Sequence, residues 1–219
     1  MSKFHLTTTR VCRVLTPLGW LALSVTFSLV LVFSILFSHK FLAPTQPVKG
    51  EVLVVEGWLP DYALVEVKER FEKGEYRLLV TTGGRIGTGY HLSQYKTWAS
   101  LTAARLKILG IPPEKIISTL QSVINKKDRT YYSVLALNER FKKDNLLVKS
   151  MDVVSLGVHA RRTWTLYKKV FAPASVGIIA IKPKRYDPLK WWLYSAGVRS
   201  VISEMIAYLY VRLIFSPPS

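Results

Sequence analysis

The sequence predicts a three-layer α/β domain with a mostly parallel five-stranded sheet, preceded by one N-terminal transmembrane helix. Three observations lead to this prediction: a long uncharged segment near the N-terminus, five short apolar runs rich in β-branched residues, and amphipathic segments that alternate with those runs. Apolar strands that alternate with helices are typical of a parallel sheet covered on both faces. The 219 residues suffice for one ordinary domain and a small additional element.

The first element is an uncharged segment over residues 14–37. Its most apolar part, residues 18–37, would span roughly 30 Å as an α-helix, which matches the hydrocarbon core of a bilayer. A signal peptide has a shorter apolar region and a small-residue cleavage site, and residues 38–44 contain no convincing site. A buried core helix fits poorly, because the segment has no polar face. We therefore predict an uncleaved transmembrane helix over residues 14–38.

The charges around this segment predict its orientation. Lys3, Arg10 and Arg13 precede it, whereas Lys40 is the one firm positive charge that closely follows it. Because the more positive flank usually stays in the cytoplasm, residues 1–13 are expected to be cytoplasmic. The main domain would then lie outside the inner membrane of a bacterium.

A proline-containing linker over residues 39–50 leads into the α/β domain, residues 51–219. The first strand is the run VLVV at 52–55, and the helix after it, 62–73, has one apolar face and ends before a glycine. The second strand, 77–82, ends at a pair of glycines.

The rest of the domain continues the alternation. A helix over 95–109 stops before a glycine and two prolines, a helix that Asp128 or Thr130 could cap ends near residue 142, and a third helix covers 160–171. The remaining strands are again apolar runs, at 115–120, 152–158 and 176–181. The result is a Rossmann-like domain in the broad sense.

The last segment, residues 191–215, has an apolar stripe with helical spacing that Arg199, Glu204 and Arg212 interrupt. These charges argue against a second membrane span. We expect a helix packed on the sheet. The alternative is a helix that partly touches the bilayer, with the tryptophan pair at 191–192 at the level of the lipid headgroups.

The composition restricts the partners. Lys and Arg number 31 against 14 Asp and Glu, and the net charge of +17 predicts a polyanionic neighbour such as inner-membrane lipid or a phosphate-bearing ligand. Nucleic acid is not expected, because the predicted location is extracytoplasmic and no nucleic-acid-binding motif is found. The single Cys12 allows no internal disulfide, and the four histidines are too far apart for a metal pair, so no metal site is predicted. A Mg²⁺ ion bridged by the phosphate of a substrate is the alternative. The sequence specifies neither a cofactor nor an oligomeric state.

Candidate site residues follow from the sheet. In open parallel sheets, ligands bind beyond the carboxyl ends of the strands. The residues at these places are Glu56, Gly57, Gly83, Gly84, Asp128, Arg129, Thr130, His159, Arg161 and Arg162.

Each of these residues has a functional and a structural interpretation. Gly83 and Gly84 would let backbone N–H groups approach an anion, or would form a plain tight turn. A helix that opens with Arg161 and Arg162 suggests a phosphate or carboxylate clamp, because a helix N-terminus favours anions. Beside it, His159 would act as acid, base or hydrogen-bond donor, or would be structural. Asp128 is the second candidate for proton transfer, or a mere helix cap.

The order of these motifs resembles the YdcF-like (SanA/ElyC/YdcF) family of bacterial envelope proteins. The resemblance covers residues 52–181: strands ending in Glu56-Gly57 and Gly83-Gly84, a helix ending in LGIP at 109–112, and His159 after the fourth strand with Arg162 three residues on. It implies a Rossmann-like domain outside the inner membrane and a link to peptidoglycan, cell wall biogenesis and undecaprenyl-phosphate carriers.

The resemblance carries over site roles for Gly83, Gly84, His159 and Arg162. This chain has Glu56-Gly57 where the family commonly has Gly-Gly, and an Asp-Arg-Thr start at 128–130 where the family has an Asn-Thr pattern. It therefore resembles a divergent member with a more cationic site.

The expected function is that of a membrane-anchored envelope protein that binds a phosphate-bearing cell-wall or lipid-linked precursor. If the protein is an enzyme, it would also process this precursor. One alternative is a non-catalytic sensor or scaffold of envelope machinery. Another is a cytoplasmic-facing binder of a nucleotide or of S-adenosylmethionine.

Overall fold

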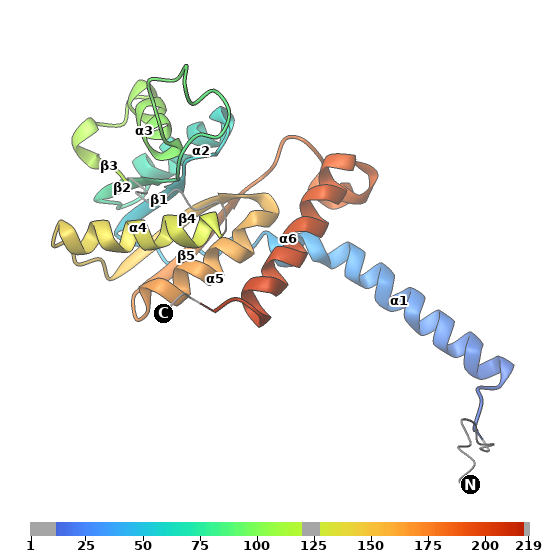
Figure 1. Cartoon of the computed structure of the whole chain (residues 1–219). Helices are drawn as coiled ribbons and strands as arrows, with labels where there is room; N and C mark the ends of the chain where they lie inside the picture. Colours follow the sequence, from blue (N-terminus) through green and yellow to red (C-terminus); the bar gives the residue numbers. More distant parts are fainter. Residues whose placement is uncertain (1–11, 120–127, 217–219) are drawn as a thin grey trace, which may run out of the picture. The chain divides into compact units, whose positions relative to one another are not determined.

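The structure, a computed structural model, describes residues 12–119 and 128–216 (Figure 1). The chain divides into two units, one that ends at Phe37 and a compact one that begins at Ser38. The positive residues Lys3 and Arg10, used above to predict orientation, lie outside the described residues.

The first described element is helix α1, Pro17–Leu42, which has 26 residues and is long and apolar enough to cross a membrane. None of the side chains in its most apolar stretch is buried. The hydroxyl of Ser34 donates to the carbonyl of Val30, one turn earlier, so this polar group is satisfied within the helix. The helix begins three residues later and ends four residues later than the predicted 14–38, so residues 39–42 of the predicted linker are helical.

A five-stranded sheet with the order β3-β2-β1-β4-β5 forms the centre of the domain. Every pair of neighbouring strands is parallel, so the predicted mostly parallel sheet is confirmed and is in fact wholly parallel. The strands are β1 Val52–Glu56, β2 Leu78–Thr82, β3 Ile116–Ser118, β4 Ser150–Leu156 and β5 Ser175–Ile181.

Helices cover both faces of the sheet, as Figure 1 shows. Helices α2, Asp61–Lys73, and α3, Trp98–Ile108, pack on one face through an apolar cluster that includes Leu64 and Leu106. Helices α4, Arg129–Lys143, and α5, Ala160–Phe171, cover the other face. The end of α6, Ser195–Leu213, joins this second cluster. The three layers follow because β1, buried along its whole length, offers apolar side chains to both faces.

Two boundaries differ from the sequence prediction in ways that affect the site. The fourth strand ends at Leu156, because Gly157 turns to a positive φ of 51° and starts a short 3₁₀ turn, Gly157–His159. This turn carries His159 off the sheet edge. A second 3₁₀ segment, Pro188–Leu193, precedes α6, so the C-terminal α-helix begins at Ser195 and not at 191. The predicted third strand ends earlier, at Ser118, and its expected last residue, 120, is outside the described residues.

Buried hydrogen bonds hold the segment before β1 on the sheet. Gln46 pairs with Ile178 of β5 in an isolated antiparallel bridge. The fully buried carboxylate of Asp152 accepts hydrogen bonds from the N–H groups of Val48 and Gly50 and from the hydroxyl of Tyr76. Residues 46–50 are therefore a fixed part of the domain.

Candidate functional site

The carboxyl ends of β1, β2 and β4 open into a cavity of about 1310 Å³. The strand order reverses between β1 and β4, and this reversal is where open α/β sheets usually bind ligands. The cavity is bounded by the loop after β2, the start of α4, the start of α5 and one side of α6.

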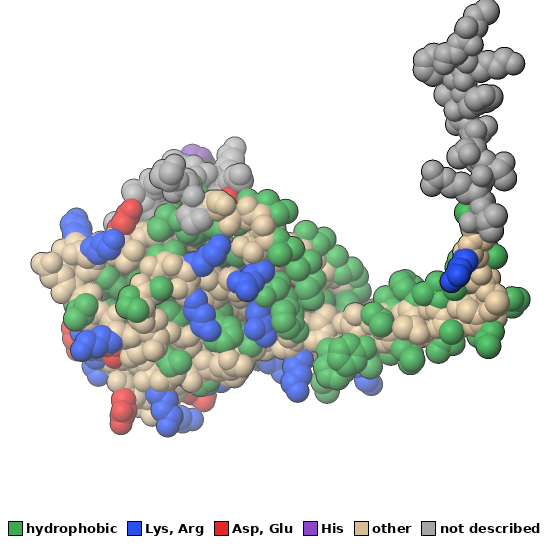
Figure 2. Space-filling model, turned by 90° about the horizontal axis from the view of Figure 1, so that it is seen from below, with side chains coloured by type: hydrophobic (Ala, Val, Ile, Leu, Met, Phe, Trp, Pro, Cys, Tyr) green, Lys and Arg blue, Asp and Glu red, His purple; other side chains and the backbone are tan. Residues whose placement is uncertain are grey.

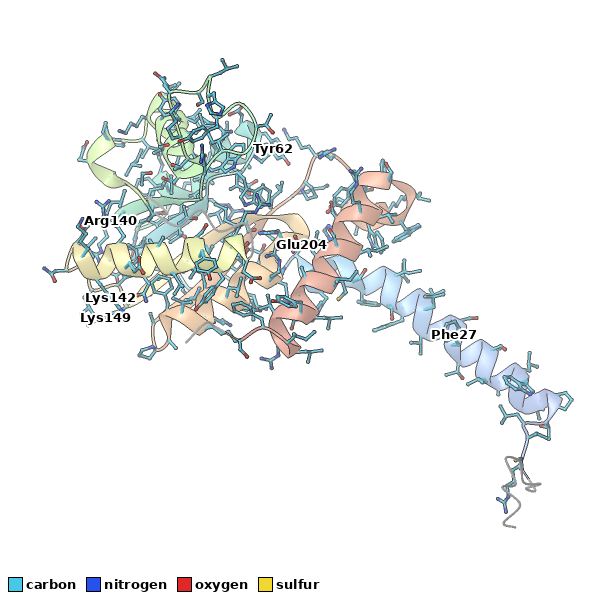
Figure 3. The ribbon with its side chains drawn as sticks, viewed as in Figure 1. Phe27, Tyr62, Arg140, Lys142, Lys149 and Glu204 are labelled. Carbon is cyan, nitrogen blue, oxygen red and sulfur yellow. The ribbon has the colours of Figure 1, made fainter. Side chains whose placement is uncertain are left out.

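The floor of the cavity holds His159 between two carboxylates from distant parts of the chain. Its Nε2 lies 3.4 Å from Oε1 of Glu56, at the end of β1, and its Nδ1 lies 2.8 Å from Oε1 of Glu204, on α6. The ring of Trp58 packs edge-on against the imidazole at 5.0 Å between ring centroids. Figure 3 shows Glu204 on the side of α6 that faces the domain. The imidazole is thus fixed at both nitrogens.

Arg162 completes this cluster. Its Nε lies 2.8 Å from Oε2 of Glu204, and its Nη2 lies 3.1 Å from Oε1 of the same carboxylate. Its Nη1 donates to the hydroxyl of Thr130 at 3.1 Å. The guanidinium therefore binds Glu204 with two nitrogens and ties α4, α5 and α6 together.

Glu56 is held by hydroxyl groups as well as by His159. The Ser155 hydroxyl of β4 donates to its Oε2, and the Thr163 hydroxyl of α5 donates to its Oε1 at 3.0 Å. Glu56 is buried, with 5% of its surface exposed. A carboxylate in such a place needs partners to remain charged, and these donors supply them.

These contacts set the charge of the cluster. Burial opposes the charged form of His159, but Glu56 and Glu204 outweigh it and raise the pKa of His159 to about 9, with Arg162 acting in the opposite direction. Burial acts to raise the pKa of both carboxylates, but their hydrogen bonds and the nearby positive charges outweigh it. The pKa of Glu204 falls to about 2, and the pKa of Glu56 lies below its usual value. The two carboxylates therefore favour the protonated form of His159 at neutral pH. Of the roles expected for it, this favours proton donor over base.

The upper part of the cavity is positively charged. On the floor of the cavity, the negative charges of Glu56 and Glu204 balance the positive charges of Arg162 and protonated His159. Asp128 is the third carboxylate among the described lining residues. The described lining includes four further arginines, all exposed: Arg85, Arg129, Arg185 and Arg199. None of the four is within ion-pair distance of an acid in the part of the chain described, and this excess of arginine favours an anionic ligand.

Two of the predicted glycines are required by the geometry. A Cβ on Gly57 would lie 2.6 Å from the carbonyl oxygen of Thr82 and from the backbone of Trp98, so β1 and α3 approach too closely for any side chain. Gly83 has a φ of 138°, which L-residues rarely adopt. Among the described residues, no acceptor is present for the N–H groups of Gly83 and Gly84, while both carbonyl oxygens accept from the start of α3.

The structure brings most of the predicted site residues together. Eight of the ten line the cavity: Glu56, Gly83, Gly84, Asp128, Arg129, Thr130, His159 and Arg162. Gly57 does not, because its N–H donates to Thr82 and its carbonyl accepts from Thr102. Arg161 also lies elsewhere: its guanidinium stacks on the Phe41 ring and its Nε donates to the Phe41 carbonyl.

The helix start at residues 128–130 differs from the expected cap. Asp128 occupies the N-cap position of α4 in a left-handed conformation, φ 51°, and its side chain makes no capping hydrogen bond. The Thr130 hydroxyl instead accepts from Arg162. Thr130 therefore takes part in the floor cluster, and Asp128 lines the cavity without capping the helix.

Among the site residues that sequence reasoning missed, which include Arg199, Glu204 makes the closest contacts. It was noted only as a charge that interrupts the apolar C-terminal segment. It is the single acid between residues 188 and 219, and an isolated acid in an apolar helix needs a buried partner. That signal could have identified it, but pairing it with His159 and Arg162 required the fold.

The described residues hold no group of three His, Cys, Asp or Glu side chains arranged to bind a metal ion. No family model, curated protein or solved structure matches this chain. The site is therefore argued from its own geometry.

Proposed function

We propose that this chain is a membrane-anchored protein of the bacterial cell envelope whose cavity binds a phosphate-bearing, lipid-linked or cell-wall precursor. The observation that carries the proposal is the charge of the cavity, where five arginines face three carboxylates at the carboxyl edge of a parallel sheet. Arginine is the side chain best suited to bind phosphate oxygens in pairs.

Different parts of the cavity would have different tasks. Gly83 and Gly84 offer backbone N–H groups to phosphate oxygens, and Arg129 and Arg199 offer guanidinium groups from α4 and α6. The floor cluster of Glu56, His159, Glu204 and Arg162 would hold these elements in register. His159, whose two nitrogens are held by Glu56 and Glu204, would keep this cluster fixed beneath the bound phosphate.

The location follows from the proposed anchor. With α1 in the inner membrane and the N-terminus in the cytoplasm, the cavity would face lipid-linked precursors outside the cytoplasm. Nucleotides and S-adenosylmethionine would not be available there. The excess of positive charge before α1 supports this orientation, as does the resemblance to YdcF-like envelope proteins.

The proposal is tested by titrating the detergent-solubilised full chain with farnesyl pyrophosphate, inorganic pyrophosphate and farnesol in a calorimeter. Both phosphates are expected to bind, and farnesol is not. The double variant Arg129→Ala/Arg199→Ala is expected to weaken phosphate binding about tenfold or more, because each removed charged hydrogen bond contributes about 1.5–3 kcal/mol.

Lys142→Ala is the matched control, since it removes one positive charge from the same helix as Arg129. Lys142 is exposed and lies at the end of α4 away from Glu204 (Figure 3). It should leave affinity unchanged. Absence of phosphate binding, or an equal loss in Lys142→Ala, would contradict the proposal.

A further inference from the structure

Helix α6 carries an apolar stripe on its exposed side. The stripe consists of Ile202, Ile206, Leu209 and Leu213, which are 50%, 63%, 44% and 75% exposed. Their spacing of three and four residues places them on one side of the helix. An exposed helix side in contact with water normally carries polar residues, so this stripe indicates a surface that is covered by something apolar.

The opposite side of α6 packs against the rest of the domain. Val201 and Val211 are buried, and Glu204 binds His159 and Arg162. At 3.6 residues per turn, Glu204 is on the opposite side of the helix from the stripe. The same helix therefore forms a wall of the cavity and presents an apolar surface outward.

The apolar surface extends beyond α6. Leu189 and Leu193 of the preceding 3₁₀ segment are 81% and 69% exposed, and Ile214 follows the stripe at 72%. Trp192 is partly exposed and packs edge-on against the buried Trp191. Figure 2 shows hydrophobic side chains gathered over α6, with Lys and Arg side chains beside them. We call this surface the α6 platform: residues 189, 192, 193, 202, 206, 209, 213 and 214.

The chain itself connects the α6 platform to the proposed anchor. Residues 38–42, the last turn of α1, belong to the same unit as α6. The ring of Phe41 packs edge-on against Tyr208 of α6 at 5.4 Å between centroids. Only one helical turn separates Phe41 from the apolar segment that ends at Phe37. Residues 38–42, which directly follow the proposed anchor, are thus held against α6.

The positive charge near the α6 platform indicates the kind of surface that the platform would bind. Residues 153–219 contain ten Lys and Arg and two acids. Without the cavity residues Arg162, Arg185, Arg199 and Glu204, seven basic residues remain against Asp187 alone. On α5, Arg161 stacks on Phe41 at 4.3 Å and Lys168 on Trp164 at 3.4 Å. Apolar residues bordered by basic and aromatic ones are typical of a helix that lies in the headgroup layer of an anionic bilayer.

We propose that the α6 platform lies on the surface of the bilayer that α1 enters, with its apolar side chains among the lipid and the neighbouring basic residues on anionic headgroups. Binding to a protein partner would require neither the neighbouring basic residues nor the direct connection of the domain to α1. Because α6 also carries Glu204, one wall of the cavity is then seated at the membrane surface. The inference uses the proposed anchor for its continuity argument and does not depend on the ligand of the cavity.

The test places the environment-sensitive fluorophore NBD on single cysteines of the full chain, in a Cys12→Ser background. The sites are Ile206→Cys on the α6 platform, Glu139→Cys on the exposed side of α4 as the matched control, and Leu29→Cys in α1. Each labelled chain is reconstituted in vesicles of phosphatidylglycerol and phosphatidylethanolamine with or without doxyl-labelled lipid. Doxyl groups quench only fluorophores that contact the bilayer.

We expect quenching at residue 206 at least threefold stronger than at 139, and weaker quenching at 206 when phosphatidylcholine replaces phosphatidylglycerol. Leu213→Glu should reduce the signal at 206 with no change in thermal unfolding, because the side chain is exposed. Quenching at 206 no stronger than at 139 overturns the inference. A blue-shifted label at 206 without doxyl quenching would mean a protein partner and also overturns it. Residue 29 reports the anchor separately, and the titration with pyrophosphate reports the cavity.

Discussion

At the scale of single residues, the carboxylate of Glu204 organises the site. His159 and Arg162 stand at the start of α5, where positive charge is unfavourable next to the helix dipole. The sequence therefore suggests a bound anion at this place. The structure supplies one from the chain itself, because Glu204 lies within 2.8 Å of both side chains. The bound ligand is then expected higher in the cavity, at the arginines that lack acidic partners.

The first prediction concerns Glu204→Gln. The variant removes the negative charge between His159 and Arg162 and leaves two buried cations close together. We expect the free energy of unfolding to fall by about 3 kcal/mol and the pKa of His159 to fall from about 9. Urea unfolding and NMR titration of the imidazole measure the two effects.

Glu139→Gln on the exposed side of α4 is the control for this variant. It should change the free energy of unfolding by no more than about 0.5 kcal/mol. If Glu204→Gln unfolds at the same urea concentration as this control, the floor cluster is not a stabilising unit.

The second prediction concerns pH. The pKa of His159 is raised to about 9 in the folded chain and is about 6.5 in an unfolded one. Since the raised value belongs to the folded state, its stabilisation is fully present below pH 6.5 and is lost as the pH rises through 9. The expected loss is about 3 kcal/mol. Urea unfolding at pH 6 and pH 9.5 measures it.

His159→Gln supplies the comparison for this pH dependence. The variant lacks the titrating group, so its stability should change much less between the two pH values than that of the parent chain. Parallel pH profiles of parent and variant would show that another group is responsible.

At the scale of elements, close packing between β1 and α3 positions the cavity. The hydroxyl of Thr102 on α3 donates to the carbonyl of Gly57 at 2.6 Å. The loop from Gly57 to Leu59 then turns beneath the cavity and places Trp58 against His159. Gly57 was predicted as a site residue and does not line the cavity, and the lack of a side chain at this position lets the two elements approach.

The third prediction follows from this approach. In Gly57→Ala, the new Cβ would meet backbone atoms of Thr82 and Trp98 at 2.6 Å, and backbone cannot move aside as a flexible side chain can. We expect a loss of about 1–3 kcal/mol in unfolding free energy and weaker pyrophosphate binding, measured by urea unfolding and calorimetry.

Gly87→Ala serves as the control for this substitution. Its Cβ would have no atom within 4 Å. The variant should keep the stability of the parent chain. Equal stability of Gly57→Ala and Gly87→Ala would contradict the close approach of β1 and α3.

At the scale of the whole molecule, topology brings together residues that are far apart in sequence. The central position of β1, with β2 on one side and β4 on the other, sets residues 56, 83 and 159 at one edge. Helix α6 closes this edge with Glu204. The proposed function joins this cavity to an apolar helix that is long enough to cross a bilayer.

The fourth prediction concerns the side of the membrane on which the domain lies. Alkaline phosphatase fused after Ser219 is active only outside the cytoplasm, and green fluorescent protein fused at the same place folds poorly outside. We expect an active phosphatase fusion and a dark fluorescent one, because the positive charges before α1 retain the N-terminus inside. The reverse pattern would contradict the envelope location and favour a cytoplasmic ligand such as a nucleotide.

Much of the fold could be predicted from the sequence because it depends on local patterns. The period of apolar residues distinguishes strands from helices within a few residues, and strand–helix alternation leaves a parallel sheet as the stable arrangement. The run of uncharged residues before position 38 identified α1 in the same way. His159 and Arg162 could be found because a local rule, the position at the end of an apolar strand, selects them.

The tertiary structure alone decided which charges meet. Glu204 is 42 residues from Arg162 and lies on a helix whose sequence indicates only a buried side, so no local pattern links the two. Arg161 and Arg162 are adjacent in sequence, yet one stacks on Phe41 while the other binds Glu204, because successive helical residues point about 100° apart. Local periodicity thus determined the elements. The pairing of charges was decided by the packing of those elements, since electrostatic interactions act through distance in space and not along the chain.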